Sequence, residues 1–304
     1  MFECGTRARA ERGRKRGQKL RGRRDGWLMI APLTAFLILL LALPLAVDLV
    51  YAVSRVTFET LRAPRIVGLH NFDVVLRDGE FWGAMLFSLR FAVLVTAAEL
   101  LLALTLAIFL APLLARFPWL MAPLLLPMMV APALVGLMYR LVLHEFVGAV
   151  PYYFVLLTGD SPSFLGPANV FWTLVTIETL QWTPFALLIL YTAYQSIPSD
   201  VREAAALDGP GPLQMLRYIE LPLMRPVILA VGFIRFIDSF RVFDNVYTLT
   251  GAGAGGDTTT ISIYIYEAFF RRNDIGVAVA ASMILLAVAF AMLTLVLRWS
   301  ERRA

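Results

Sequence analysis

The sequence predicts an all-α integral membrane protein, and three observations support this assignment. The chain has 304 residues, of which 59% are hydrophobic and only 16% are charged, whereas soluble domains usually contain about 25% charged residues. The mean hydropathy is +0.73. The apolar residues also gather in long stretches, as expected of helices that need about 20 apolar residues to cross a hydrocarbon core of about 30 Å. Together these features exclude an ordinary soluble protein.

Six apolar stretches are long enough to cross a membrane as helices. They cover residues 27–53, 83–110, 119–143, 170–194, 227–249 and 276–297. We therefore expect a basic tail over residues 1–26 and a six-span domain over residues 27–304. The first stretch is longer than the apolar region of an ordinary signal peptide and lacks a clear cleavage site, so it should remain attached as the first span.

The basic tail sets the expected orientation. It carries ten Lys and Arg residues between Arg7 and Arg24, and the positive-inside rule places such a segment in the cytoplasm. Six spans would return the C-terminus to the same side. Arginine runs also bind nucleic acid, but a disordered tail that sets topology and favours anionic lipid explains the same composition. We expect membrane lipid, and no nucleic acid, as a partner.

Motifs of common enzymes and metal sites do not occur in the sequence. Cys4 is the single cysteine, and His70 and His144 lie far apart in the sequence, which predicts neither a disulfide nor a metal site. Residues 251–256 match G-x-G-x-x-G, but outside the strand-turn-helix context that binds a pyrophosphate. Walker A, H-E-x-x-H and G-x-S-x-G patterns are missing. We expect a chain without catalytic residues or a cofactor of its own.

A charged segment, residues 195–226, separates the fourth and fifth stretches and predicts two short helices. Asp200 can cap the first helix, with Glu203 three residues later completing a capping box. Gly209 suits the left-handed conformation that often follows a helix. Helices shorter than about 12 to 15 residues are marginal alone in water, so this segment should pack on a partner surface.

The second helix of this segment should begin at Pro212, since a proline in the first helical turn loses no hydrogen bond. Pro222 would end it near Leu221. Its apolar side chains should share one face. They are Leu213, Leu216 and Ile219.

Residues Ser196 to Pro222 resemble the EAA loop of permease subunits in binding-protein-dependent ABC importers. Family members carry Glu-Ala-Ala, a glycine six positions after the glutamate, and a later isoleucine before Leu-Pro. Here these positions are Glu203, Ala204, Ala205, Gly209, Ile219, Leu221 and Pro222. The stretches VGLHNFDVVLRDGEFW, LPMMVAPALVGLMYRLVL, QWTPF and FDNVYTLTGAG are similar to stretches of the carbohydrate-importer branch of the maltose-permease type. The resemblance covers most of the chain from Trp27 onward.

This resemblance implies a type I ABC importer permease fold in the bacterial cytoplasmic (inner) membrane. It implies as partners a second permease subunit, two ATPase subunits that bind ATP and Mg, and an extracytoplasmic binding protein. Residues 195–226, called the EAA segment below, would be the coupling loop that docks on an ATPase. The expected coupling residues are Glu203, Ala204, Ala205, Asp208, Gly209, Leu213, Leu216, Ile219, Leu221 and Pro222. An ordinary helical hairpin that merely links two spans is the alternative.

The fifth stretch contains charges that lipid disfavours. Arg235, Asp238, Arg241 and Asn245 recur at spacings of three and four, which places them along one helical stripe. A charge at mid-membrane costs about 2.5–3.5 kcal/mol on insertion scales, so these side chains should face protein or a water-filled path. Alternatively, Arg235 and Asp238 neutralise each other, while the rest pair with the second permease.

Polar groups beside aromatic rings suit a sugar, because hydroxyls bond to carboxylates and amides while rings cover the apolar faces of a pyranose. The expected substrate path comprises Asp238, Arg241, Asn245, Arg235, Phe240, Tyr247, Glu178, Gln181, Trp182 and Glu99. Pro184, beside this set, predicts a kink in the fourth span.

The sequence therefore predicts a non-catalytic permease subunit of an ATP-driven importer for a sugar or related polyol. One alternative is a stand-alone secondary carrier that uses Glu99, Glu178 or Asp238 for ion coupling. A membrane receptor that binds without transporting is another. The sequence does not identify the solute, and the membrane arginines leave an anionic one open.

Overall fold

The computed structural model describes residues 29–207, 209, 211–251 and 258–301, and the regular secondary structure of this part is helical apart from one short strand pair. Strands β1 (Ser54–Arg55) and β2 (Arg65–Ile66) pair in antiparallel fashion. The long helices are an N-terminal helix (Met29–Ala52), α3 (Gly79–Phe109), α8 (Val170–Gln195), α11 (Leu221–Phe240) and α14 (Ile275–Glu301). The shorter elements are α2 (His70–Arg77), α4 (Ala111–Arg116), η1 (Pro118–Leu120), α5 (Met121–Leu125), η2 (Leu126–Met129), α6 (Pro132–Val142), α7 (Ala149–Thr158), α9 (Ser199–Leu207), α10 (Pro212–Met215), η3 (Leu216–Glu220), α12 (Asp244–Thr250), α13 (Ile261–Tyr266) and η4 (Glu267–Arg271).

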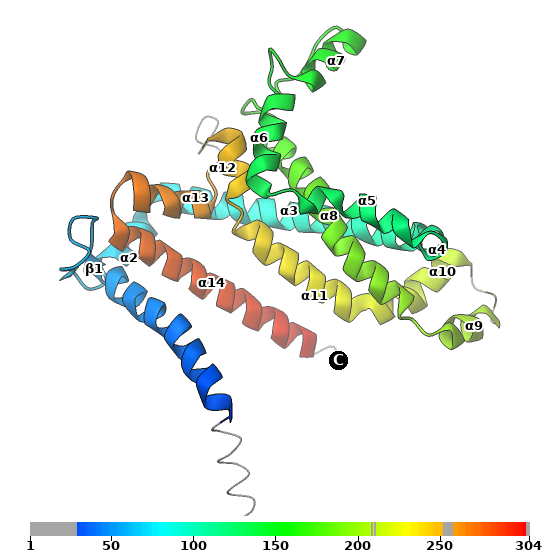
Figure 1. The fold of residues 1–304 in the computed structure, drawn as a ribbon, viewed down its shortest axis with the longest axis horizontal. Helices are drawn as coiled ribbons and strands as arrows, with labels where there is room; N and C mark the ends of the chain where they lie inside the picture. Colours follow the sequence, from blue (N-terminus) through cyan, green and yellow to red (C-terminus); the bar gives the residue numbers. More distant parts are fainter. Residues whose placement is uncertain (1–28, 208, 210, 252–257, 302–304) are drawn as a thin grey trace, which may run out of the picture.

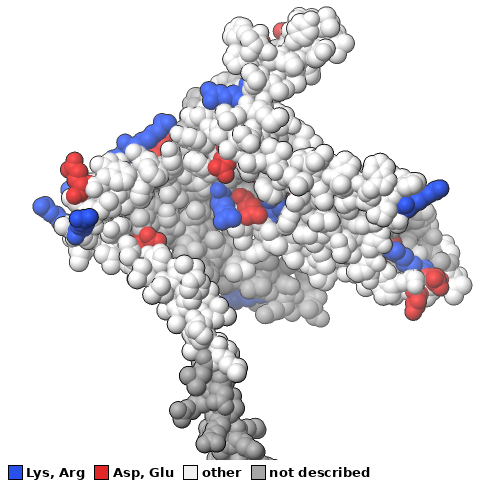
Figure 2. All heavy atoms as spheres, viewed as in Figure 1, with Lys and Arg blue, Asp and Glu red and all other residues white. Residues whose placement is uncertain are grey.

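The long helices form a bundle in which α3 packs against α8 and α11 (Figure 1). Most charged side chains in view lie toward the two ends of these helices, and the surface between the ends is largely uncharged apart from a small central group (Figure 2). The N-terminal helix leans away from the bundle (Figure 1), and its apolar stretch is not buried in the chain. This distribution fits helices that cross a membrane.

Small side chains allow the bundle helices to approach one another closely. Ala103 and Ala107 of α3 share a buried cluster with Ala186 of α8 and Val231 of α11. At Gly232 of α11, an added Cβ would lie 2.9 Å from a terminal carbon of Leu100. Small residues are typical of helix contacts in membranes, where dispersion contacts replace the hydrophobic effect as the driving force.

Four of the six expected spans form as predicted. The N-terminal helix, α3, α8 and residues 275–294 of α14 are each long and apolar enough to cross a membrane, although residues 27 and 28 lie outside the described part. α8 continues through Pro184, which lies inside the helix.

The third expected span, residues 119–143, is not one straight helix. Residues 118–129 and 132–142 meet at 83° and could form a fifth, bent span. Val130 and Ala131 are extended at the bend, with ψ of 133° and 134°. Because a residue before proline is disfavoured in the helical region, Pro132 explains why the first helix stops there.

The fifth expected span, residues 227–249, is also broken. α11 begins earlier, at Leu221, and ends at Phe240, and α12 starts only at Asp244. The carbonyls freed at the break are satisfied from elsewhere: Ser262 Oγ donates to the Arg241 carbonyl at 2.8 Å, and Thr260 Oγ1 donates to the Val242 carbonyl at 2.9 Å. Side-chain hydroxyls thus replace the backbone hydrogen bonds of a continuous helix.

The EAA segment contains α9, α10 and the π-helical turn η3. Gly209 has the expected left-handed φ of +67°, and α10 begins at Pro212 as predicted. The prediction that Asp200 caps the first helix is wrong, because Val201 N–H already donates to the Pro198 carbonyl and α9 starts at Ser199. Asp208 lies outside the described residues.

The prediction that Pro222 ends the second helix is also wrong. η3 leads directly into α11, in which Pro222 occupies the first turn. A proline in that position needs no intrahelical donor, and the preceding π-turn shifts the hydrogen-bond pattern to i→i+5. The chain therefore remains helical from α10 to the end of α11.

Candidate functional site

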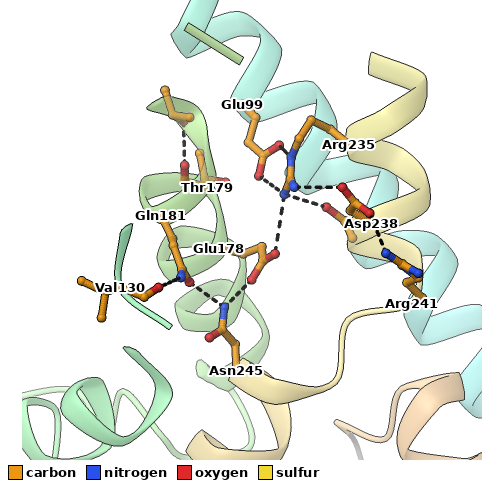
Figure 3. Close-up of polar contacts among 11 residues, drawn as sticks. Glu99, Val130, Glu178, Thr179, Gln181, Arg235, Asp238, Arg241 and Asn245 are labelled. Atoms are coloured by element: carbon orange, nitrogen blue, oxygen red, sulfur yellow. Dashed lines mark hydrogen bonds and ion pairs between the residues drawn. The ribbon is translucent and has the colours of Figure 1, made fainter. Parts of the chain in front are cut away.

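Arg235 is the centre of a buried polar cluster that joins α3, α8, α11 and α12 (Figure 3). Its Nε lies 2.7 Å from Glu99 Oε2, and its Nη2 lies 2.9 Å from Glu99 Oε1. The pair is 1% and 0% exposed. Such a two-pronged pair fixes the geometry of both side chains, and it links α3 to α11 deep in the bundle.

Two further carboxylates face the same guanidinium group. Glu178 Oε1 of α8 lies 3.6 Å from Arg235 Nη2, and Asp238 Oδ2 lies 3.6 Å from Arg235 Nη1. Asp238 also lies 3.2 Å from Arg241 Nη2. Asp238 and Arg241 are 39% and 68% exposed, so the cluster passes from a buried side to an open side.

A second part of the cluster is built on amides. Asn245 Nδ2 donates to Glu178 Oε2 at 2.6 Å and to Gln181 Oε1 at 2.9 Å. Gln181 Nε2 donates to the Val130 carbonyl at 3.1 Å, the carbonyl at the bend between η2 and α6. Because the broken helix leaves this carbonyl without an intrahelical partner, the hydrogen bond from Gln181 stabilises the bend. Among the described residues, the buried Asn245 Oδ1 has no hydrogen-bond partner.

A cavity of about 430 Å³ opens beside this cluster. Glu178, Asp238 and Asp244 supply carboxylates to its wall, while Arg235 and Arg241 supply guanidinium groups. Its other lining residues are Pro132, Trp182, Val242, Phe243 and Asn245. Figure 2 shows a small group of acidic and basic side chains at the centre of a broad uncharged face. The wall thus offers both acceptors and donors, with formally one more carboxylate than guanidinium.

The aromatic residues divide into two groups. Trp182 lines the cavity, with the Arg235 guanidinium carbon 4.7 Å from its ring centroid. Phe240 is buried and stacks on Phe236 at 6.0 Å, away from the cavity wall. Tyr247 stacks on Phe243 at 5.0 Å. Of these rings, only Trp182 and Phe243 face the cavity.

The expected single stripe is therefore replaced by a convergence of helices. Arg235 and Asp238 belong to α11, Arg241 lies just after it, and Asn245 reaches the cluster from α12 because the chain bends between them. The alternative in which Arg235 and Asp238 neutralise each other holds only in part, since Glu99 makes the closer contact with Arg235.

Some residues of the site were not expected from the sequence. The Val130 carbonyl enters it only because Pro132 bends the chain, and the two prolines around the bend, Pro127 and Pro132, are the signal for it. Asp244 and Phe243 were expected beside the polar stripe but not in the substrate path, and they line the cavity because the helix breaks before them. That break has no comparable signal in the sequence.

The described coupling residues lie between the start of α9 and the start of α11, at one end of the bundle (Figure 1). Glu203 and Ala204 are exposed, and Ala205 is half-buried. Leu213 is 75% exposed, while Leu216, Ile219 and Leu221 are half-buried and Pro222 is exposed. Leu207, outside the expected set, is 89% exposed. The EAA segment thus presents apolar side chains that nothing in the described chain covers.

Comparison with known proteins identifies relatives that are all described as components of transport systems. Residues 22–304 match a family model described as "Binding-protein-dependent transport system inner membrane component". The chain is 32% identical, over 88% of its length and 90% of the relative's, to the trehalose/maltose transport system permease protein MalF of Thermococcus litoralis. It is 25% identical, over 88% and 86%, to the trehalose transport system permease protein SugA of Mycobacterium tuberculosis.

The fold is also similar to that of a solved transporter chain. A chain in the crystal structure of a bacterial alginate ABC transporter, in complex with a periplasmic protein that carries an alginate pentasaccharide, superposes with a TM-score of 0.79. The match covers 94% of this chain and 96% of that chain, at 20% sequence identity. This similarity shows the fold.

Proposed function

The chain belongs to the family of binding-protein-dependent transport system inner membrane components, and from this premise we propose that it forms half of the path through which an ATP-driven importer moves a sugar or related polyol. The two relatives described above are permease proteins of trehalose/maltose and trehalose transport systems. The observation that carries the assignment of the path is the 430 Å³ cavity lined by carboxylates, guanidinium groups and Trp182. Concave sites with a few convergent polar groups are the usual form of small-molecule sites.

Within this site we assign different roles to exposed and buried residues. Asp238 and Arg241 reach the open side and would bond solute hydroxyls, with Trp182 and Asn245 beside them. Arg235 and Glu178 line the wall but also bind each other and their neighbours. Two further residues, Glu99 and Gln181, would hold these groups in place without touching solute, as would the expected path residues Phe240 and Tyr247.

The charge of the cavity wall favours a neutral solute over an anionic one. Each arginine already faces a carboxylate: Arg235 faces Glu99 and Glu178, and Arg241 faces Asp238. An anion would meet the excess carboxylate and compete for guanidinium groups that are already paired. Hydroxyl groups can donate to the carboxylates without such competition.

The EAA segment would dock on the ATPase partner. Its exposed Leu207 and Leu213 offer apolar contacts, the small Ala204 permits close approach, and Glu203 adds a charge at the rim. Short helices that present apolar side chains commonly bind in a groove of a partner. The partner, and not this chain, would bind ATP and Mg.

We propose that the chain crosses the inner membrane six times. In addition to the four long apolar helices, α11 would cross the membrane, because 20 residues at 1.5 Å each give about 30 Å. Its mid-helix charges, Arg235 and Asp238, face the cluster rather than lipid. The bent region from η1 to α6 would be the remaining span. Both termini and the EAA segment would then lie in the cytoplasm. A second permease, two ATPase copies and an extracytoplasmic binding protein would complete the importer.

The function is tested by uptake. A panel of labelled sugars and polyols is first used to find the solute that a strain carrying this chain takes up and a strain lacking it does not. Uptake of that solute by the strain carrying the chain is then measured with ATP depleted in one arm and ion gradients collapsed in another. Loss of uptake on ATP depletion, with uptake retained after collapse of the gradients, is the expected result. The reverse pattern would support a secondary carrier and contradict the proposal.

The path is tested at Asp238, with uptake expressed per assembled complex. Asp238→Ala removes the hydrogen bonds to solute and should abolish uptake, while Asp238→Asn keeps the shape and part of the bonding, and should retain some uptake. Asp73→Ala is the matched control, because Asp73 is a carboxylate in an exposed pair with Arg77 outside the cavity. Normal uptake by Asp238→Ala would remove this residue from the path.

A further inference from the structure

One arginine of the EAA segment contacts the ends of two bundle helices. Arg202 lies in α9. Its Nη2 donates to the backbone carbonyl of Tyr194 at 2.9 Å, its Cζ lies 4.4 Å from the centroid of the Tyr194 ring, and its Nε lies 3.2 Å from Glu220 Oε1. Tyr194 is in the last turn of α8, and Glu220 directly precedes α11. We call these three residues the Arg202 junction.

Each contact has a physical reason. Glu220 is only 6% exposed, and Arg202 is the only cation within 4.0 Å of it in the described chain; a buried carboxylate depends strongly on its cation. The Tyr194 carbonyl lies at the C-terminal end of α8, where a positive charge is favourable. The planar guanidinium can stack on a ring and donate at its edge simultaneously, which an ammonium cannot do.

The junction bridges a bend in the chain. Between α9 and α10 the backbone passes through Gly209 at φ +67°, and within the described chain no atom beyond the adjoining residues comes within 4 Å of the position of an added Cβ. The covalent connection from α9 to α11 therefore runs through an open turn. From α10 onward, by contrast, η3 continues into α11 without a break. Arg202 gives α9 a direct side-chain link to both α8 and α11.

We propose that Arg202 is a positioning residue, which fixes α9 to the ends of α8 and α11 so that movement of α9 displaces both helices together. This inference rests on the proposed docking of the EAA segment on an ATPase. The same two helices carry Glu178 and Arg235 to the cavity. The junction would thus connect the ATPase surface to both walls of the path through one side chain.

The test uses the complete importer in liposomes, with its loaded binding protein. Arg202→Met removes all three contacts, and Arg202→Lys keeps the charge without the planar group. The measurements are the amount of assembled complex, the ATPase rate, and solute uptake per ATP hydrolysed. Arg77→Met is the matched control, because this exposed arginine lies outside the EAA segment and pairs with the exposed Asp73 at 2.8 Å.

For Arg202→Met we expect an assembled complex that still hydrolyses ATP but whose uptake per ATP falls about fivefold or more, the lower end of the usual range of coupling between sites. Uptake per ATP of Arg202→Lys should fall between this variant and the unmodified protein, and that of Arg77→Met should be unchanged. Unchanged uptake per ATP in an assembled Arg202→Met complex would overturn the proposal.

A second variant covers the case in which the Arg202→Met complex fails to assemble. Arg202→Met leaves the buried Glu220 without its cation, and the double variant Arg202→Met with Glu220→Gln removes that charge. If only the double variant assembles, low uptake per ATP in it supports the proposal, and normal uptake per ATP overturns it. Failure of the proposed function is a separate outcome: the unmodified complex would then take up solute without ATP.

Discussion

The two ends of α11 are held in different ways. At the cavity end, Arg235 faces carboxylates from three helices and is 1% exposed. At the EAA end, Glu220 faces the single cation Arg202, whose side chain is 33% exposed. About 15 residues, or about 22 Å of helix, separate the two positions. The cavity end is fixed by several buried contacts, whereas the EAA end depends on one partly exposed side chain.

This difference indicates which end of α11 mainly supports the stability of the protein and which mainly supports coupling. A buried network of several hydrogen bonds and ion pairs is rigid, and removing one member leaves others unpaired. Loss of the partly exposed Arg202 leaves one carboxylate unpaired, so it should cost less stability than loss of Arg235, which leaves several. We therefore expect substitutions at the cavity end to affect folding and assembly first, and substitutions at the EAA end to affect coupling while assembly persists.

The largest effect should come from Arg235→Met. It leaves the fully buried Glu99 without a cation, and breaking a buried pair typically costs about 3–5 kcal/mol. We expect a large loss of folded protein in detergent, measured by size-exclusion chromatography and by the thermal unfolding midpoint.

Two variants check the reason for that loss. Arg235→Met with Glu99→Leu replaces the pair by apolar groups and should recover much of the stability. Arg241→Met removes an arginine that is 68% exposed and should cost no more than about 1 kcal/mol. Equal losses of stability in Arg235→Met and Arg241→Met would contradict the expected difference between buried and exposed charges.

An intermediate effect is expected at Gly136 of α6. An added Cβ would lie 1.9 Å from Thr248 Oγ1 and 3.0 Å from the Asn245 carbonyl oxygen, so Gly136→Ala should push α12 away from α6. Overpacking of this kind usually costs about 1–3 kcal/mol. The thermal midpoint should fall, and uptake should fall with it because Asn245 moves.

The control for this variant lies in α3. Gly83 has no atom within 4 Å of an added Cβ, so Gly83→Ala should leave the midpoint unchanged or raise it slightly. Adding Thr248→Ala to Gly136→Ala removes the clashing hydroxyl and should restore part of the loss. No difference between the two alanine variants would show that α12 tolerates displacement.

The smallest effect on stability should come from Gly209→Ala at the EAA end. The left-handed backbone costs a residue with a side chain about 1–2 kcal/mol, but space around the position is open. We expect near-normal assembly with reduced uptake per ATP. Gly211→Ala is the matched control, since Gly211 has a φ of −68° and tolerates a side chain. A loss of assembly in Gly209→Ala would contradict the contrast between the two ends.

The fold was predictable wherever a helix was long and uniformly apolar. α3, α8 and α14 follow directly from apolar stretches of sufficient length. The bend at Val130 could have been found from Pro132, because proline restricts the residue before it. The break after Phe240 could not, since it depends on hydroxyls of Thr260 and Ser262 that come from a distant part of the chain.

The site was predictable in composition but not in arrangement. Charges in an apolar stretch identified Arg235 and Asp238 as members of a polar site, because lipid disfavours them. Spacing alone favoured Asp238 as the partner of Arg235, since it lies three residues away. The structure instead places Glu99, 136 residues away, in closest contact. Only packing of α3 against α11 brings those two together, and no local pattern encodes it.

The separation of Glu99 and Arg235 along the chain has a consequence for biosynthesis. At about 5–20 residues per second, a ribosome makes Glu99 about 7–27 s before Arg235. During that interval α3 carries a carboxylate whose cation does not yet exist, and release into lipid would cost about 2.5–3.5 kcal/mol. The nascent α3 should therefore remain beside the insertion machinery until α11 emerges, and the two helices should enter the bilayer as a pair.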